Sequence, residues 1–333
     1  MKSSSTLVVV VGAGASFDCA LPDSTAIDDY RPPLAADLFH PKFKEILKRF
    51  PGAERCSAEI RQLMRGSISL EQALKTLQDD PKGHIRRNFR WVPLYLRELI
   101  GETQQRFISH GSNAFNRLVD EIFRVVPEIF ETVLFLTLNY DTYLEHALMA
   151  GVSEKSFGEA SDYVQPNARF ALIKLHGSVT WLHSMDTSQY ERVMGGAEIP
   201  RPDRMSIVPS YNVQPPGSLK GYPALAIPVE GKAAFYCPAI LCDTAARWLA
   251  DATDLLVIGC SLIDPDIVNF LGSIQRVNRF KIVNGSAVAG DDACARLAAH
   301  DVFRVLPGGS MPAFDGGFSK FVTEGALGNF LRD

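Results

Sequence analysis

The stretch that decides the fold reads Val8-Val9-Val10-Val11-Gly12-Ala13-Gly14-Ala15-Ser16. An unbroken apolar run is typical of a strand that is buried on both faces of a parallel sheet. Two glycines after the strand predict a tight turn into a helix, where backbone N–H groups and the helix dipole favour a pyrophosphate. A complete dinucleotide-binding motif would have a third glycine where Phe17 stands. Taken alone, the turn therefore fits a plain strand-to-helix connection equally well.

Similar apolar runs recur along the chain and predict further buried strands. They lie at residues 133–137, 171–175 and 255–259, with weaker runs at 280–283 and 302–306. Between them, apolar residues repeat at three and four positions, as at 115–126 and 267–277, which predicts amphipathic helices. Strands that alternate with helices indicate an α/β fold with a doubly wound, mostly parallel, Rossmann-like sheet.

Two segments interrupt this alternation. Residues 31–130 read as mostly helical and contain no convincing strand, which predicts a helical insertion module after the first strand and turn. Residues 184–237 are rich in Pro and Gly with little periodicity, which predicts an irregular segment with at most a short hairpin around residues 205–208. We expect residues 1–333 to form one domain that carries both segments.

Composition excludes several classes of protein. The chain has 333 residues, 46% of them hydrophobic, and a net charge of −4, which gives no general attraction to nucleic-acid phosphates. The basic stretch at residues 84–90 fits a solvated helix face better than a nucleic-acid site. No run approaches the roughly 20 apolar residues that cross a bilayer.

The cysteines argue against a disulfide scaffold and against a zinc ribbon. None of them forms a C-x-x-C pair, and a scaffold is unusual in a chain of this length. A reducing cytoplasm therefore fits best. The six cysteines are Cys19, Cys56, Cys237, Cys242, Cys260 and Cys294.

Polar residues follow two of the predicted inner strands. Asn139 and Asp141 come after the run at 133–137, and Asn139 offers both a donor and an acceptor to a sugar. In the alternative interpretation, Asn139 and Asp141 only cap the next helix. His176 follows the run at 171–175, where it is placed for a general base near neutral pH, although most lone buried histidines are core residues bound to backbone.

A fourth motif follows the run at 255–259. Gly259 and Ser261 stand at its end, where a ligand of an open α/β sheet would lie. Asp264 is expected to cap the helix that opens at Pro265.

Together and in this order, the four motifs resemble the sirtuin family. The family's Gly-Ala-Gly-x-Ser with a following Pro-Asp, its Thr-Gln-Asn-Ile-Asp, its His-Gly, its Gly-Thr-Ser-Leu and its late strand ending in Asn all have counterparts here. The matching residues are 12–16, Pro22 and Asp23, 137–141, His176 and Gly177, 259–262, and Asn284.

The departures from the family are as informative as the matches. Sirtuin deacylases carry two C-x-x-C pairs that hold a structural zinc, and a Phe-Arg after the Pro-Asp. This chain has residues 184–237 in place of the zinc ribbon, and Ser24-Thr25 in place of Phe-Arg. In these respects it resembles the zinc-free, sirtuin-like NAD hydrolases of bacterial anti-phage defence.

The resemblance implies an enzyme, an NAD glycohydrolase that uses NAD as its substrate and holds no zinc. It implies Asn139 and His176 as the catalytic residues. It also implies a homo-oligomer in the cytoplasm and a defence partner such as a hexameric ATPase or an Argonaute-type protein, with no direct binding of nucleic acid or membrane. The residues implied to bind NAD are Gly12, Ala13, Gly14, Ser16, Pro22, Asp23, Asp141, Gly259, Ser261 and Asn284.

Two other functions fit the same motifs. One is an NAD-dependent protein deacylase or ADP-ribosyltransferase, which would need an acceptor besides NAD. The other is a non-catalytic sensor of NAD or ADP-ribose. The presence of both Asn139 and His176 argues against a sensor.

Overall fold

The computed structural model describes residues 5–21, 31–66, 68–108, 113–125, 128–152, 156–164, 169–199, 205–229, 237–300 and 313–332. A six-stranded sheet lies at the centre, in the order β3 (Phe170–Lys174), β2 (Thr132–Thr137), β1 (Thr6–Val11), β7 (Ala252–Ile258), β8 (Arg279–Val283) and β9 (Ala313–Phe314). All neighbouring strands in this sheet run parallel. The prediction of a doubly wound, mostly parallel, Rossmann-like sheet is confirmed.

The first apolar run forms the middle of this sheet. β1 lies between β2 and β7, and residues 7–11 are all fully buried. Full burial of a Val or Leu side chain contributes roughly 1.5–3 kcal/mol, so these five residues are a large part of what holds the sheet together. Five of the six expected strands are present, and the expected strand at 302–306 lies outside the described residues.

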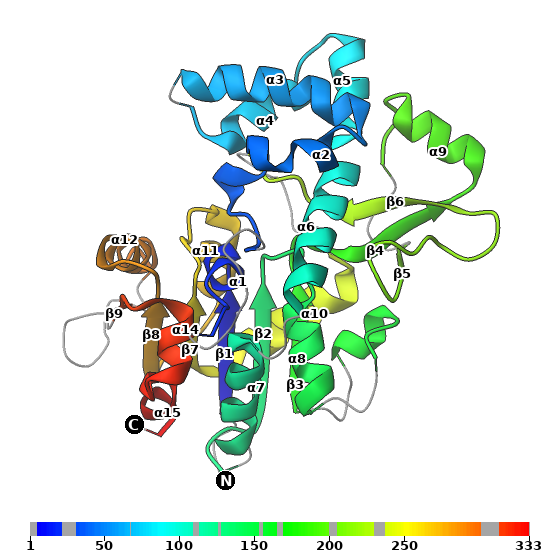
Figure 1. The fold of residues 1–333 in the computed structure, drawn as a ribbon. Coiled ribbons are helices and arrows are strands. Elements are labelled where there is room, and N and C mark those ends of the chain that lie inside the picture. The colour runs from blue at the N-terminus through cyan, green and yellow to red at the C-terminus, as the bar shows by residue number, and fades with distance from the viewer. Residues whose placement is uncertain are drawn as a thin grey trace.

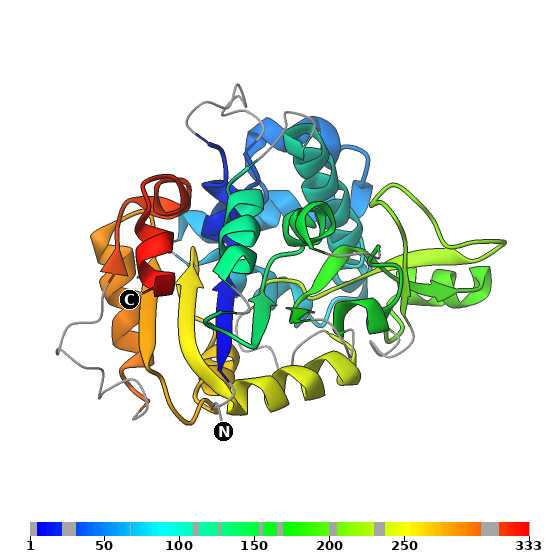
Figure 2. The ribbon, with the colours of Figure 1, turned by 90° about the horizontal axis from the view of Figure 1, so that it is seen from below.

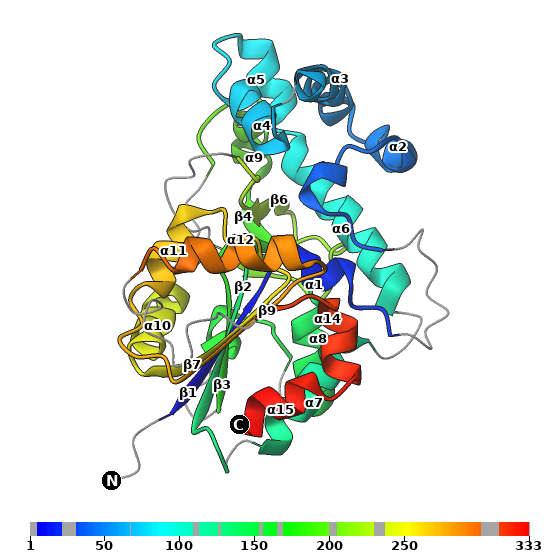
Figure 3. The same ribbon diagram turned by 90° about the vertical axis from the view of Figure 1, so that its left-hand side faces the viewer.

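Helices cover both faces of the sheet (Figure 3). One face carries α7 (Ala114–Val125), α8 (Tyr143–Gly151), α14 (Gly317–Thr323) and α15 (Ala326–Arg332). The other face carries α10 (Ala239–Ala250), α11 (Pro265–Leu271) and α12 (Ala287–Leu297), and Figure 2 shows α10 on the side of the sheet opposite α7. No helix in the described part of the chain is long and apolar enough to cross a membrane.

Between the first turn and α7, every described element is helical. The segment contains η2 (Ala35–Asp37), η3 (Pro41–Phe43), α2 (Lys44–Leu47), α3 (Pro51–Arg65), α4 (Leu70–Gln78), α5 (Gly83–Phe89) and α6 (Val92–Ile108). In Figure 1 it stands above the carboxyl ends of the strands. It has an apolar core of its own, and Tyr140, which follows β2, packs against that core. The helical region is therefore in contact with the strand ends.

The segment after His176 is more regular than its composition predicts. β4 (Gly177–Met185) pairs antiparallel with β5 (Met205–Ile207) on one side and with β6 (Lys220–Leu225) on the other, and α9 (Thr187–Met194) follows β4. The short 3-10 helix η4 (Ala160–Val164) precedes β3. The expected local hairpin near residues 205–208 is wrong, because β5 pairs with the distant β4. Such long-range pairing leaves no local periodic signal.

Burial of His183 on β4 has a consequence for pH stability. Burial lowers the pKa of His183 to about 4, whereas an unfolded histidine titrates near 6.5. Stability from the neutral ring is thus fully present above about pH 6.5 and is lost as pH falls towards 4, by about 2 to 3 kcal/mol at pH 4.5. Urea unfolding at pH 7 and 4.5 should show a smaller pH-dependent loss for His183→Gln than for the wild type. Equal losses of stability in the two proteins would contradict a lowered pKa for the buried His183 ring.

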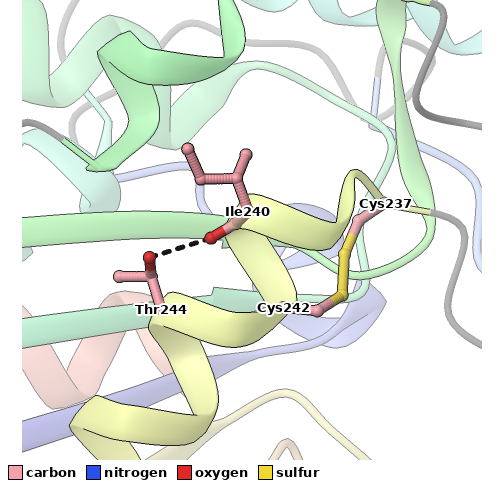
Figure 4. The surroundings of a disulfide bond; sticks show 4 residues. All are labelled: Cys237, Ile240, Cys242 and Thr244. Carbon is pink, nitrogen blue, oxygen red and sulfur yellow. Dashed lines mark hydrogen bonds between the residues drawn. A yellow bond between two sulfur atoms is a disulfide. The ribbon is translucent and has the colours of Figure 1, made fainter.

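One disulfide joins Cys237 to Cys242 at the start of α10 (Figure 4). Their Cα atoms are 6.8 Å apart and five positions separate them in sequence, so the bond closes only a short loop at the helix entry. The composition did not predict this bond, because a spacing of five is not a usual disulfide signal. The described free cysteines, Cys19, Cys56, Cys260 and Cys294, are all buried.

Candidate functional site

The strand register brings the predicted motifs to one edge of the sheet. Lys174, Thr137, Val11, Ile258 and Val283 pair in one row across five strands. Each motif begins within two residues of this row, at the carboxyl ends where open α/β sheets bind ligands. The residues placed there are Gly12, Asn139, His176, Gly259 and Asn284.

Two glycine turns pack backbone against backbone at the centre of this edge. The Gly12 and Gly14 N–H groups donate to the carbonyls of Ile258 and Gly259, each at 2.9 Å. A Cβ atom on Gly12 would lie 2.5 Å from the Gly259 carbonyl oxygen, and one on Gly259 would lie 2.0 Å from the Ala15 nitrogen. Gly259 also has φ +58°, which disfavours other residues. These glycines therefore serve close packing, and the N–H groups of Gly12 and Gly14 are already used.

Asn139 is held by the first turn in one orientation. Its Nδ2 donates to the Gly12 carbonyl at 2.9 Å and to Ser16 Oγ at 2.8 Å. A carbonyl only accepts hydrogen bonds, so the amide nitrogen has to face Gly12. The oxygen, Oδ1, is buried without a hydrogen-bond partner, on a side chain that is only 6% exposed. An unpaired buried acceptor costs about 1–3 kcal/mol, and a ligand hydroxyl or water would relieve that cost.

Asp141 bonds Ser16 and, through it, helps to orient Asn139. Ser16 Oγ donates to its Oδ2 at 2.7 Å, so the Ser16 oxygen is left to accept from Asn139. Its Oδ1 accepts from the Tyr143 N–H at 3.2 Å, at the start of α8. Burial raises the pKa of the Asp141 carboxyl, partly offset by the charge of Lys174 and the bond from Ser16. Asp141 thus bonds the first residue of α8, whose N-cap residue is Thr142, whereas the Asn139 side chain bonds Gly12 and Ser16.

A buried ion pair holds the backbone beside Asn139. Lys174 on β3 is fully buried, and its Nζ lies 3.0 Å from Glu145 Oε1 and donates to the Asp141 carbonyl. Glu145, in the first turn of α8, also accepts from the Tyr163 hydroxyl at 3.4 Å. Lys174 thus ties the loop after β2 to the end of β3.

Removing only one charge of this ion pair should strongly lower the free energy of unfolding. Lys174→Met leaves the Glu145 carboxylate buried without its cation, which destabilises a protein by about 3–5 kcal/mol. The double variant Lys174→Met/Glu145→Gln removes both charges and should recover much of that loss. Urea unfolding of the single and double variants measures both, and a double variant no more stable than the single one would contradict the pairing.

His176 lies at the end of β3, opposite Asn139. It is 8% exposed, its ring centroid is 6.5 Å from that of Tyr140, and its Nε2 is 3.5 Å from Asp264 Oδ2. Gly177, with φ +82°, turns the chain sharply into β4, and the His176 carbonyl accepts from the Ala226 N–H at 2.8 Å. His176 is thus a buried polar residue at the carboxyl edge of the sheet, where the chain leaves β3 for β4.

The remaining predicted residues are placed less decisively. Ser261 is exposed, and its carbonyl accepts from Arg296 at 2.8 Å. Asn284 follows β8, but its Nδ2 donates to the Ala289 carbonyl at 3.2 Å, so its amide also stabilises α12. Ala13 lies in the first turn of the short helix α1 (Ala13–Phe17). The predicted Pro22 and Asp23 lie outside the described residues.

Three residues of the site were not singled out from the sequence. Lys174 and Glu145 meet only in three dimensions, although a lysine inside an apolar run is a signal for a buried partner. Tyr140 packs against the core of the helical region, and its hydroxyl donates to the carbonyl of Ala226, just after β6, at 2.6 Å. In the described part of the chain, no group of three or more His, Cys, Asp or Glu side chains is placed to hold a metal ion.

No family model and no curated protein matches this chain. Among solved structures, chains of Sir2 enzymes are similar to it. One, from work on the mechanism and regulation of Sir2 enzymes, is 17% identical with a TM-score of 0.41, over 99% of this chain and 93% of that chain. A mutant Sir2 homologue in complex with 2'-O-acetyl ADP ribose is 16% identical with a TM-score of 0.43, over 99% and 92%. A complex of Sir2 with a p53 peptide and NAD+ is 13% identical with a TM-score of 0.43, over 97% and 93%.

Proposed function

We propose that the chain binds NAD at this edge of the sheet and hydrolyses its nicotinamide–ribose bond to nicotinamide and ADP-ribose. The observation that carries the proposal is Asn139, whose amide nitrogen is pinned while its buried oxygen lacks a partner. The same edge holds His176 and the glycine turn. The four motifs that resemble the sirtuin family therefore converge on one place.

Cleavage of the nicotinamide–ribose bond does not need a strong general acid. Nicotinamide leaves as a neutral molecule from a cationic precursor, through an oxocarbenium-like transition state as in glycoside hydrolysis. The protein has to orient the ribose and a water. Asn139 Oδ1 accepts a hydrogen bond from a ribose hydroxyl or from the water. As water oxygen bonds to the ribose carbon, His176 accepts the proton that is released, and that proton then passes to solvent.

The other predicted residues would hold the rest of NAD. Ala13 and Ser16, with Gly12 and Gly14, would lie along the pyrophosphate at the start of α1, although the N–H groups of Gly12 and Gly14 are bonded within the protein and would not donate to it. Gly259, Ser261 and Asn284 would line the adenosine side. Asp141 acts through Ser16 on Asn139, and Pro22 and Asp23 complete the motif in sequence.

An NAD hydrolase would deplete its own cell, so we also propose that its activity is controlled by self-assembly or by a partner in anti-phage defence. A hexameric ATPase or an Argonaute-type protein is the kind of partner that the sequence resemblance implies. The helical region is the candidate surface, because its core contacts Tyr140 beside His176.

Chromatography of NAD incubated with the purified chain tests the reaction. Nicotinamide and ADP-ribose should appear in equal amounts without any peptide, and an acylated peptide should not speed their release. Turnover that requires the peptide would instead make the chain a deacylase. Binding of NAD without release would make it a sensor.

A further inference from the structure

Asp264 makes a contact that its expected role as a helix cap does not explain. It precedes α11, and its carbonyl accepts from the Val268 N–H at 3.4 Å. Its carboxylate, however, lies 3.5 Å from His176 Nε2, and the two side chains are 24% and 9% exposed. The side chain that was expected to cap α11 thus faces the proposed base.

The position of Asp264 in the fold makes this contact unusual. Asp264 follows β7 and His176 follows β3, and β1 and β2 lie between those strands. Strands are about 4.8 Å apart, so β3 and β7 lie about 14 Å apart, and the loops that follow them close this gap together with the two side chains. The gap lies between the ends of β3 and β7, next to β1 and β2, which lead to Gly12 and Asn139.

The backbone of the loop after β7 is held in a specific conformation. Leu262 has φ +53°, the only positive φ of a residue other than glycine in the described part of the chain, and its side chain is buried. A leucine in the left-handed region is disfavoured by about 1–2 kcal/mol, so packing has to hold it there. Gly259, with φ +58°, begins the same turn. The contact between Asp264 and His176 thus belongs to a defined loop conformation.

Tyr140 is a third side chain at this place. Its ring centroid lies 6.5 Å from that of His176, and Asp264 Oδ2 lies 3.5 Å from His176 Nε2. Burial raises the pKa of Tyr140, and the negative charges of Glu71 and Asp264 raise it further, which agrees with a carboxylate nearby.

We propose that Asp264 is a positioning residue for His176, holding its ring and stabilising the imidazolium that forms when His176 accepts a proton. A carboxylate beside a histidine base has this role in hydrolases of unrelated folds, where its neutral amide analogue lowers turnover by orders of magnitude. The inference rests on the proposed function and deepens it. The motif of Gly259 and Ser261 then extends to Asp264, so this loop supplies one side chain of the reacting centre.

Kinetics of nicotinamide release test the role. Asp264→Asn should lower kcat by at least about 100-fold with KM changed less than about threefold, and Asp264→Glu should recover at least about tenfold of that loss. Asp251→Asn, at an exposed site that ends α10, is the matched control and should leave both constants unchanged. An unchanged kcat in Asp264→Asn, or a raised KM alone, would overturn the positioning role.

A spectroscopic measurement separates failure of this inference from failure of the proposed function. The ring ¹⁵N signals of His176, assigned with His176→Gln, should shift in Asp264→Asn even without NAD. If the wild type releases no nicotinamide but the signals shift, the proposed function is wrong and the pairing stands. If the signals do not shift, the pairing itself is wrong.

Discussion

Asn139→Ala is expected to lower the rate of nicotinamide release by at least about 100-fold, the usual scale for removing one preorganised polar group from a reacting centre. The substitution removes a buried oxygen at the carboxyl edge that the glycine turn orients and that has no hydrogen-bond partner. It also removes two hydrogen bonds to Gly12 and Ser16, so unfolding has to be measured beside turnover.

The control for this variant is Asn329→Ala, because Asn329 is exposed on α15, which lies beside the amino-terminal end of β8 and not at the carboxyl edge. Asn329→Ala should keep wild-type turnover. If folded Asn139→Ala released nicotinamide at more than a tenth of the wild-type rate, Asn139 would not be at the reacting centre.

Gly259→Ala should damage both stability and NAD binding. The added Cβ would meet the Ala15 nitrogen at 2.0 Å, and the backbone would stay at φ +58°. Left-handed strain and overpacking together predict a loss of about 2 to 5 kcal/mol in the free energy of unfolding. Relief of the clash has to push the loop after β7 away from the Gly12 turn, so KM for NAD should rise at least about tenfold, by our estimate from the loss of that contact.

Gly83→Ala is the matched control for this prediction. Gly83 begins α5, and nothing lies within 4 Å of a Cβ built on it. Alanine favours a helix over glycine, so this variant should be as stable as the wild type or slightly more stable. Wild-type stability and KM in Gly259→Ala would mean that the two turns do not pack as described.

The fold was predictable because its strands are buried on both faces. Residues 7–11 and 255–259 are apolar without alternation, which is a local property of the sequence, and they form β1 and β7 side by side. β9 and β4 were not predictable in the same way. β9 has two residues, and β4 contains polar residues with distant partners, such as Ser184, whose hydroxyl donates to Ser206 Oγ at 2.8 Å.

Part of the site was predictable from local sequence for the same reason, and part was not. Gly12, Asn139 and His176 each follow a recognisable strand, so their meeting at one edge follows from a parallel sheet. The pairing of Asp264 with His176 joins the loops after β7 and β3, which are not neighbouring strands. Local sequence favoured a helix cap for Asp264, because an acidic residue before Pro265 is common at a helix start.

Hydrolysis of NAD is tested by incubating the purified wild-type chain with NAD in H₂¹⁸O and following the products by mass spectrometry. Nicotinamide should be released steadily without any acyl acceptor, with one ¹⁸O atom incorporated into the ADP-ribose, because water is the nucleophile. NAD left intact, or ADP-ribose recovered only on another molecule, would mean that the chain does not hydrolyse NAD.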